Sequence, residues 1–163
     1  DVNGDGLEDL IIGAPLLDQS GTTDVGRAYV VYGTTNTTQA IDLSAVAAGS
    51  GGFVINGRNT GSDQVGNAVS AAGDFNGDGL AALLVGARYA DPAGAFTAGR
   101  RSVVFGQSTT GAVEASAIVA GIGGFVINGQ CEKDHSGVSV AGVGDVNGDA
   151  PACPARGWPP QSA

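Results

Sequence analysis

The stretch DVNGDGLEDLIIGAP at residues 1–15 returns as DFNGDGLAALLVGAR at residues 74–88. In both places a loop of aspartate, asparagine and glycine runs directly into a short apolar segment. Aspartate, asparagine and glycine dominate tight turns, whereas a bounded run of branched apolar residues is typical of a buried strand. The pattern therefore predicts, twice, a turn that leads into a strand.

Other segments recur at a similar spacing. GGFVING at 51–57 is repeated letter for letter at 123–129, and GRAYVVYG at 26–33 is matched by GRRSVVFG at 99–106. A third acidic loop starts at Asp145. The spacing is 71 to 73 residues (74 to 145, 51 to 123, 26 to 99). Self-similarity at a fixed period indicates one supersecondary unit copied along an array.

The composition favours an all-β fold. The 163 residues include 29 glycines and no methionine, and glycine is costly inside helices but useful in tight turns. One period holds four predicted strands, at 52–56, 67–72, 81–87 and 100–105. Their consecutive apolar residues predict sheets covered on both faces, whereas a sandwich or jelly roll would show clearer alternation. Four-stranded antiparallel blades of a β-propeller meet this requirement.

This unit divides the chain into four expected segments. They are a partial blade with an acidic loop at 1–50, a complete blade at 51–106, a partial blade at 107–149 and a degenerate, unstructured tail at 150–163. Two strands are expected in each partial blade, within 7–32 and within 124–143. The chain is thus predicted to be a propeller fragment of about two and a quarter blades, fewer than the four to eight that close a ring.

The oxygen donors of the first loop have the spacing of a cation site. In the pattern DxNGDGxxD, the donors are the side chains of Asp1, Asn3, Asp5 and Asp9 and the carbonyl of Leu7. Calcium accepts about six to eight such oxygens in a flexible geometry. An EF-hand would need an acid at position twelve, which is apolar here. A solvated turn is the simpler alternative, since the same residues dominate turns.

The later loops depart from this pattern. The second loop carries Ala82 at position nine, so it lacks one carboxylate and is expected to bind calcium more weakly or not at all. Its remaining donors are Asp74, Asn76, Asp78 and the carbonyl of Leu80. The third loop, from Asp145, replaces the second glycine by Ala150 and has no acid at position nine. We expect the third loop to be inactive.

These residues resemble the FG-GAP repeat of integrin α-chain propellers and their bacterial relatives. The Gly-Ala-Pro triplet stands at 13–15 and becomes Gly-Ala-Arg at 86–88, and the aromatic-glycine pair stands at 32–33 and 105–106. The resemblance extends over residues 1–149. It implies a propeller of about seven blades in a longer parent protein, Ca²⁺ in the loops, and an extracellular or cell-surface role in adhesion or ligand recognition.

Charge and motifs narrow the classes of function. The net charge of −9 argues against nucleic acid as a partner, and no apolar stretch predicts membrane insertion. A single histidine and the absence of a GxSxG or HExxH motif predict that the chain is not an enzyme. The expected partners are an unknown extracellular protein or glycan ligand and the remaining blades of the parent propeller. The alternative is a non-catalytic accessory propeller of a large extracellular hydrolase.

Some repeated residues outside the acidic loops are expected to have structural roles. Asp63 and Asp134 are interpreted as hydrogen-bond acceptors in loops, and Arg27 and Arg100 as candidates to pair with the loop acids. Two cysteines without a disulfide framework around them are expected to be free or incidental.

Overall fold

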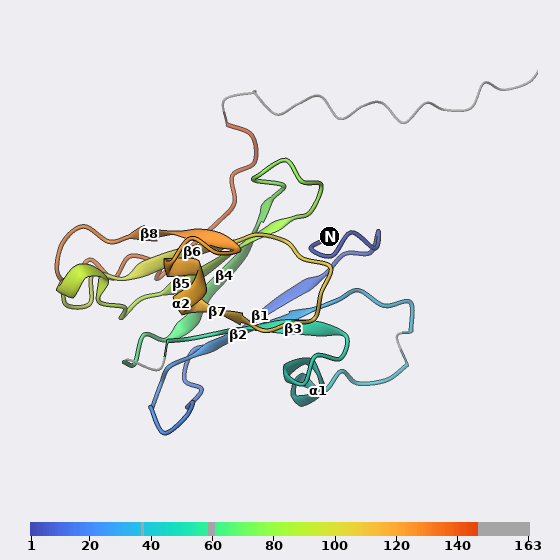
Figure 1. Cartoon of the computed structure of the whole chain (residues 1–163), viewed down its shortest axis with the longest axis horizontal. Coiled ribbons are helices and arrows are strands. Elements are labelled where there is room, and N and C mark those ends of the chain that lie inside the picture. Colours follow the sequence, from blue (N-terminus) through green and yellow to red (C-terminus); the bar gives the residue numbers. More distant parts are fainter. Residues whose placement is uncertain (37, 59–60, 147–163) are drawn as a thin grey trace, which may run out of the picture.

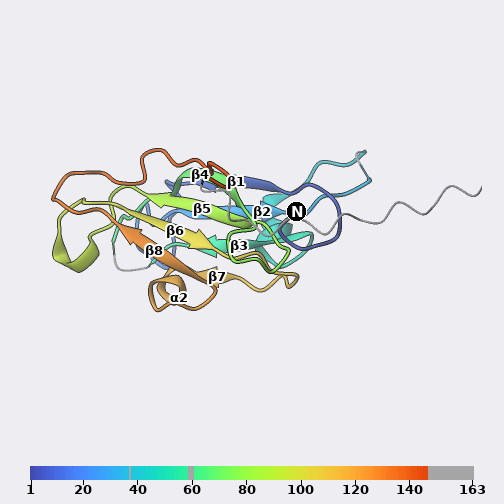
Figure 2. The ribbon, with the colours of Figure 1, turned by 90° about the horizontal axis from the view of Figure 1, so that it is seen from above.

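The computed structural model describes residues 1–36, 38–58 and 61–146. It contains two four-stranded sheets that lie against each other (Figures 1 and 2). The first has the order β1 (Leu10–Ala14), β2 (Arg27–Val31), β3 (Gly52–Asn56) and β7 (Val113–Glu114). The second has the order β4 (Val65–Gly73), β5 (Ala82–Ala87), β6 (Arg100–Val104) and β8 (Gly124–Asn128). The fold is therefore all-β, and its sheets are those of a propeller-blade fragment, as predicted.

The sheet pairing divides the chain at a different point from the one expected. Strand β3 pairs with β2, which precedes it, so the proposed complete blade at 51–106 does not coincide with a sheet. The complete antiparallel sheet instead extends from 65 to 128. The reason is that each GGFVING segment closes the outer edge of the sheet before it: Phe53 lies opposite Val30, as Phe125 lies opposite Val103. The repeat period is unaffected.

The two partial blades also differ from expectation. The first sheet contains the two strands expected within 7–32, and its outer edge gains β7, which runs parallel to β3. Within 124–143 the structure has one strand, β8, followed by an isolated bridge between Ser136 and Gly99. The expected tail at 150–163 lies outside the described residues.

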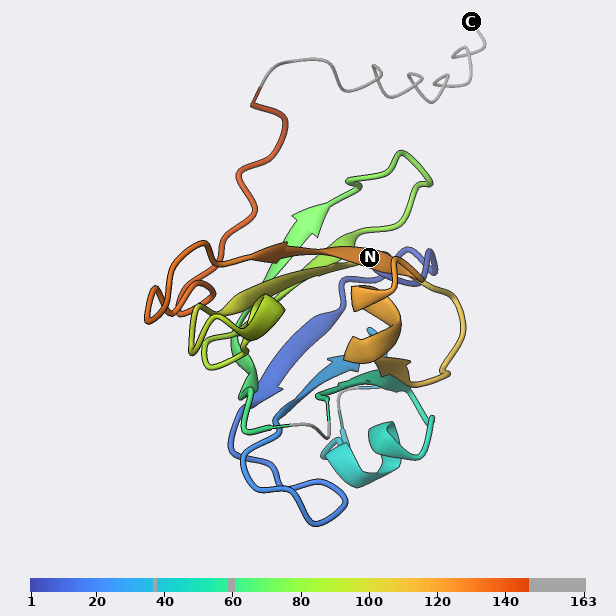
Figure 3. The same ribbon diagram turned by 60° about the vertical axis from the view of Figure 1, so that its left-hand side comes forward.

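Two short helices were not predicted from the sequence. They are α1 (Leu43–Ala47) and α2 (Ala115–Val119), and they lie near the outer strands (Figure 3). A short 3₁₀ turn, η1 (Pro92–Gly94), lies between β5 and β6. The side chain of Asp42 accepts a hydrogen bond from the Ser44 amide at 2.8 Å and so caps the start of α1. A helix of five residues is too short for a periodic apolar pattern to show.

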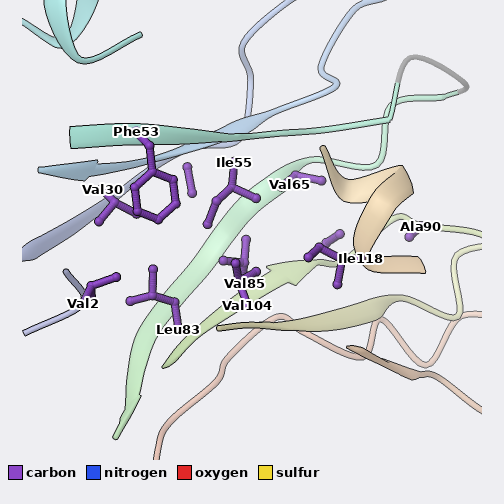
Figure 4. Packing of buried hydrophobic residues seen from close by; sticks show 12 residues of the cluster. Val2, Val30, Phe53, Ile55, Val65, Leu83, Val85, Ala90, Val104 and Ile118 are labelled. Atoms are coloured by element: carbon purple, nitrogen blue, oxygen red, sulfur yellow. The ribbon is translucent and has the colours of Figure 1, made fainter. Parts of the chain in front are cut away.

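The main core lies between the two sheets. Val30, Phe53 and Ile55 of the first sheet pack with Leu83 and Val104 of the second, and all are at most 2% exposed (Figure 4). Residues that alternate with these on β2 and β3 form a second cluster with Val46 of α1. Strands β2 and β3 are thus covered on both faces, as their consecutive apolar residues predicted.

Candidate metal-binding loops

The first acidic loop is organised by Asp1. Its Oδ1 accepts a hydrogen bond from the Gly4 amide at 2.7 Å, and its Oδ2 accepts one from the Gly6 amide at 2.9 Å. Both glycines have left-handed backbone angles, with φ of 79° and 85°, which other residues rarely adopt. The loop therefore curls around the Asp1 carboxylate.

Asn3 and Asp5 make a second set of contacts inside this loop. The Asn3 side chain accepts from the Asp5 amide at 3.0 Å and donates to Asp5 Oδ2 at 2.9 Å. Asp5 Oδ1 accepts from the Leu7 amide at 2.8 Å. The hydrogen bond from Asn3, followed by that from Leu7, lowers the pKa of Asp5 below its ordinary value. Asp5 is therefore held as an exposed carboxylate.

Asp9 has a structural role that the sequence did not indicate. Its Oδ2 accepts from the Val2 amide at 2.6 Å and its Oδ1 accepts from the Gly33 amide at 2.7 Å. Gly33 is the glycine of the first aromatic-glycine pair, and a Cβ at that position would lie 2.5 Å from the Cβ of Leu7. Asp9 thus links Val2, at the start of the loop, to Gly33, which follows the end of β2 and lies close to Leu7.

The second loop has nearly the same internal bonds. Asp74 accepts from the amides of Gly77 and Gly79 at 2.8 and 3.0 Å. The Asn76 side chain donates to Asp78, which also accepts from the Leu80 amide at 2.8 Å. At position nine the fully buried Ala82 has no carboxylate to offer Gly106, the counterpart of Gly33. The turn is therefore the same in both repeats. The link from the position-nine carboxylate to the Val2 and Gly33 amides, which we call the anchor, is present only in the first.

The donor chemistry of loop one fits a calcium ion. Each carboxylate oxygen offers about two acceptor sites, so a bond from one amide leaves room for a cation, and calcium prefers such hard oxygen donors. Within residues 1–36, 38–58 and 61–146, however, no three Asp, Glu, His or Cys side chains gather at one centre. Chemistry and turn geometry therefore support a calcium site, while a closed set of carboxylate ligands is not present.

The sequence-predicted donors fall into two spatially ordered groups. Asp1, Asn3 and Asp5 are held by hydrogen bonds within one turn, and Asp74, Asn76 and Asp78 within another. Asp9 lies apart from the first group, because its carboxylate accepts from the Val2 and Gly33 amides. The third loop starts at Asp145, and its later positions lie outside the described residues.

The repeated arginines bind outer-strand asparagines instead of loop acids. Arg27 Nε donates to Asn56 Oδ1 at 2.8 Å, and Arg100 Nε donates to Asn128 Oδ1 at 3.0 Å. Each pair links opposite residues of neighbouring strands. The expected pairing of Arg27 and Arg100 with the acidic loops is therefore wrong, because their side chains point across the sheet.

Asp63 and Asp134 occupy matching positions in different surroundings. Asp134 is exposed and accepts from the Cys131 amide at 2.8 Å, as expected of a loop acceptor. Asp63 is only 8% exposed. Burial raises its pKa above the ordinary value, although Arg58 and Arg100 act in the opposite direction. Cys131 is exposed and free.

Comparison with known proteins identifies the repeat. The family model described as FG-GAP repeat matches residues 1–31. The chain is 40% identical over 90 residues to bovine phosphatidylinositol-glycan-specific phospholipase D, covering 53% of this chain. It is 38% identical over 104 residues to Drosophila integrin alpha-PS2, covering 58%, and 31% identical over 147 residues to mouse integrin alpha-IIb, covering 84%. It spans only 10%, 6% and 13% of these three relatives.

A separate observation concerns membranes. None of the helices in the described part of the chain has the length and apolar character needed to cross a bilayer.

Proposed function

Because the chain belongs to the FG-GAP repeat family, we propose that it is a calcium-stabilised propeller module of a secreted or cell-surface protein. The module gives structural support to adhesion or ligand recognition and has no catalytic role of its own. Its partners are an extracellular protein or glycan and further blades of the propeller.

The organisation of loop one carries this proposal. Three carboxylates and one amide are held within nine residues, and net charge is concentrated there. A cation would neutralise this charge and stiffen the turn that connects the loop to β1. Asp1, Asn3, Asp5 and Asp9, with the carbonyl of Leu7, would hold it. Calcium affinities of about 10⁻⁴ to 10⁻³ M are typical of extracellular modules.

Calorimetric titration of the chelator-treated chain with calcium tests the proposal. We expect heat that saturates near about one equivalent, because only loop one has the carboxylate at position nine. Asp5→Asn removes a donor charge from the loop and should abolish most of this heat. Glu8→Gln is the control for the loss of one charge, since Glu8 is exposed and holds none of the predicted ligand positions, although its carboxylate lies 3.7 Å from the amino group of Asp1. A folded chain that gives no calcium heat would refute the proposal.

The match to phospholipase D supports a second candidate. In this case the module would be the accessory propeller of a large extracellular hydrolase, as 53% of the chain aligns with that enzyme at 40% identity. Sequencing the parent gene on both sides of this region separates the two candidates. A neighbouring hydrolase motif supports the accessory role, and further FG-GAP repeats alone support adhesion or recognition.

A further inference from the structure

One asparagine of the chain stands in the acceptor motif for an N-linked glycan. Asn36, Thr37 and Thr38 form the pattern Asn-X-Thr in which X is not proline, and N-linked glycans are attached to secreted chains at this pattern. None of the other asparagines in the sequence is followed, two positions later, by serine or threonine. The loop between β2 and α1 therefore holds the single candidate acceptor.

The side chain of Asn36 is turned so that its nitrogen stays open. Asn36 Oδ1 accepts hydrogen bonds from the Thr38 amide at 3.2 Å and from the Thr38 hydroxyl at 2.8 Å. An asparagine oxygen that bonds the backbone two residues further on makes an Asx turn. Both bonds use the oxygen, and Asn36 Nδ2 donates to no residue in the described part of the chain. This nitrogen is the atom to which a sugar is attached.

The folded chain has room for a sugar at this position. Asn36 and Thr38 are exposed in the loop that leads from β2 to α1 (light blue in Figure 1). Residues 34–36 and 38–41 of this loop belong to neither of the two apolar clusters. A glycan on Asn36 therefore disturbs no core contact.

The second repeat shows that this position stays open when another sheet lies in front of it. By the repeat, Thr109 is the counterpart of Asn36. The loop of Thr109 contacts the first sheet, because Tyr32 Oη donates to the carbonyls of Gln107 at 3.1 Å and of Thr109 at 2.7 Å. Residues 108–112 are exposed all the same. Exposure is therefore a property of the loop itself and persists beside a packed neighbour.

We propose that Asn36 carries an N-linked oligosaccharide. The inference rests on the secreted or cell-surface setting of the proposed function, because these glycans are attached to secreted chains. The donor is an oligosaccharide linked to a lipid pyrophosphate. Asn36 Nδ2 forms a bond to C1 of the first sugar as the bond between C1 and the pyrophosphate oxygen breaks. The pyrophosphate leaves with the electron pair, and a base of the transferase takes one proton from Nδ2.

The glycan lies beside loop one without using its donors. Asn36 follows Gly33, whose amide bonds the Asp9 anchor, so the attachment point is at the acidic-loop end of the first sheet. Asn36 is not one of the predicted calcium ligands. A bulky, solubilising sugar at this place covers the loop between β2 and α1 and leaves the calcium donors unchanged.

Electrophoresis of the whole chain secreted from animal cells tests this proposal. The wild-type chain should migrate as a slower band, which peptide N-glycosidase should convert to the mobility of the unmodified chain. Because this enzyme turns the glycosylated asparagine into aspartate, mass spectrometry of the treated chain should find the conversion at Asn36. Asn36→Gln and Thr38→Ala should each abolish the slower band. Both residues are exposed, so the variants should keep their folded circular dichroism.

The matched control is Thr35→Ala, which alters an exposed threonine of the same loop outside the motif and should leave the slower band unchanged. Chain retained inside the cells gives the same comparison for a variant that is not secreted. A wild-type chain without the slower band would overturn the proposal. A slower band that persists in Asn36→Gln, or that Thr35→Ala abolishes as fully as Thr38→Ala, would also overturn it.

The calcium titration separates this inference from the proposed function. The glycosylated wild type and Asn36→Gln should give the same calcium heat, because Asn36 lies outside the ligand set. A glycan on a chain that gives no calcium heat would refute the calcium proposal alone. Calcium heat from a secreted chain without a glycan would refute the present inference alone.

Discussion

The loops at 1–9 and 74–82 share a turn but differ in how that turn is fixed to the sheet. In each loop the position-one aspartate gathers two glycine amides, and the asparagine at position three donates to the aspartate at position five. Position nine differs between the loops. In the first loop it is Asp9, whose carboxylate accepts hydrogen bonds from two further amides, those of Val2 and Gly33. The shape of the turn therefore does not depend on position nine.

The difference separates two properties that one motif usually combines. Turn shape follows from the first six positions, since aspartate and asparagine side chains bond nearby amides and glycine permits positive φ. Attachment and the third carboxylate follow from position nine. In the second repeat Ala82 is 0% exposed, so apolar burial replaces the charged anchor. We expect stability and calcium affinity to separate along the same division.

Replacing the anchor should have the largest effect. Asp9→Ala leaves the Val2 and Gly33 amides without their acceptor, and a buried donor left unpaired costs about 1–3 kcal/mol. The variant should therefore unfold at lower urea concentration than the wild type and lose its calcium heat. Urea unfolding with and without calcium measures both effects. Asp9→Asn keeps an oxygen acceptor, so it should lose calcium heat with a smaller loss of stability. Equal stability of Asp9→Ala and wild type would show that the anchor contributes nothing.

The converse change gives the second loop an anchor. Ala82→Asp places a carboxylate in a fully buried position, so without calcium the variant should be less stable than wild type, because burying an unpaired charge is costly. With calcium at about a hundredfold excess over its dissociation constant, binding contributes about 2.7 kcal/mol. Thermal unfolding with and without calcium should therefore show a larger calcium-dependent increase for the variant. Ala82→Asn, which adds an amide without charge, is the control, and an equal increase in both would contradict this account.

The features that the sequence predicted are those set by local residues. The turns follow from neighbours within the first six loop positions, and the strands follow from short apolar runs such as Leu83 to Val85. The repeat spacing predicted several similar sheets. The consecutive apolar residues on β2 predicted that these sheets stack, because such a strand needs cover on both faces. Local information of this kind was sufficient for the class of fold.

What the sequence did not show depends on pairing between distant residues. Strand β3 joins the sheet before it because its residues bond β2, and nothing within residues 52–56 distinguishes that partner from the strands that follow. The acceptor role of Asp9 depends on Gly33, which lies 24 residues away. Likewise, Arg27 reaches Asn56 across the sheet, 29 residues away. The repeated Arg and Asn positions were visible in the sequence, and their nearly equal spacing, 29 and 28 residues, was the signal that could have identified this pair.

The smallest of the expected effects concerns Asp63 and Asp134, which occupy matching positions of the repeat in different surroundings. Burial raises the pKa of Asp63, with Asp91 acting in the same direction and Arg58 and Arg100 against it. A carboxyl whose pKa is raised by folding stabilises the protein fully below its unfolded value, about 3.8. This contribution is lost as the pH rises through the folded value.

Asp63→Asn removes this titration, so the stability of the wild type relative to the variant should fall as the pH rises from about 3.8 to neutrality. Urea unfolding of both proteins over that range measures the difference. Using the difference is necessary because the pKa values of Asp5 and Asp42 are lowered by hydrogen bonds, and their contributions change with pH in the opposite direction. Asp134→Asn controls for the loss of one charge at an exposed site. If the difference stayed constant or increased with pH, burial would not be what distinguishes the two aspartates.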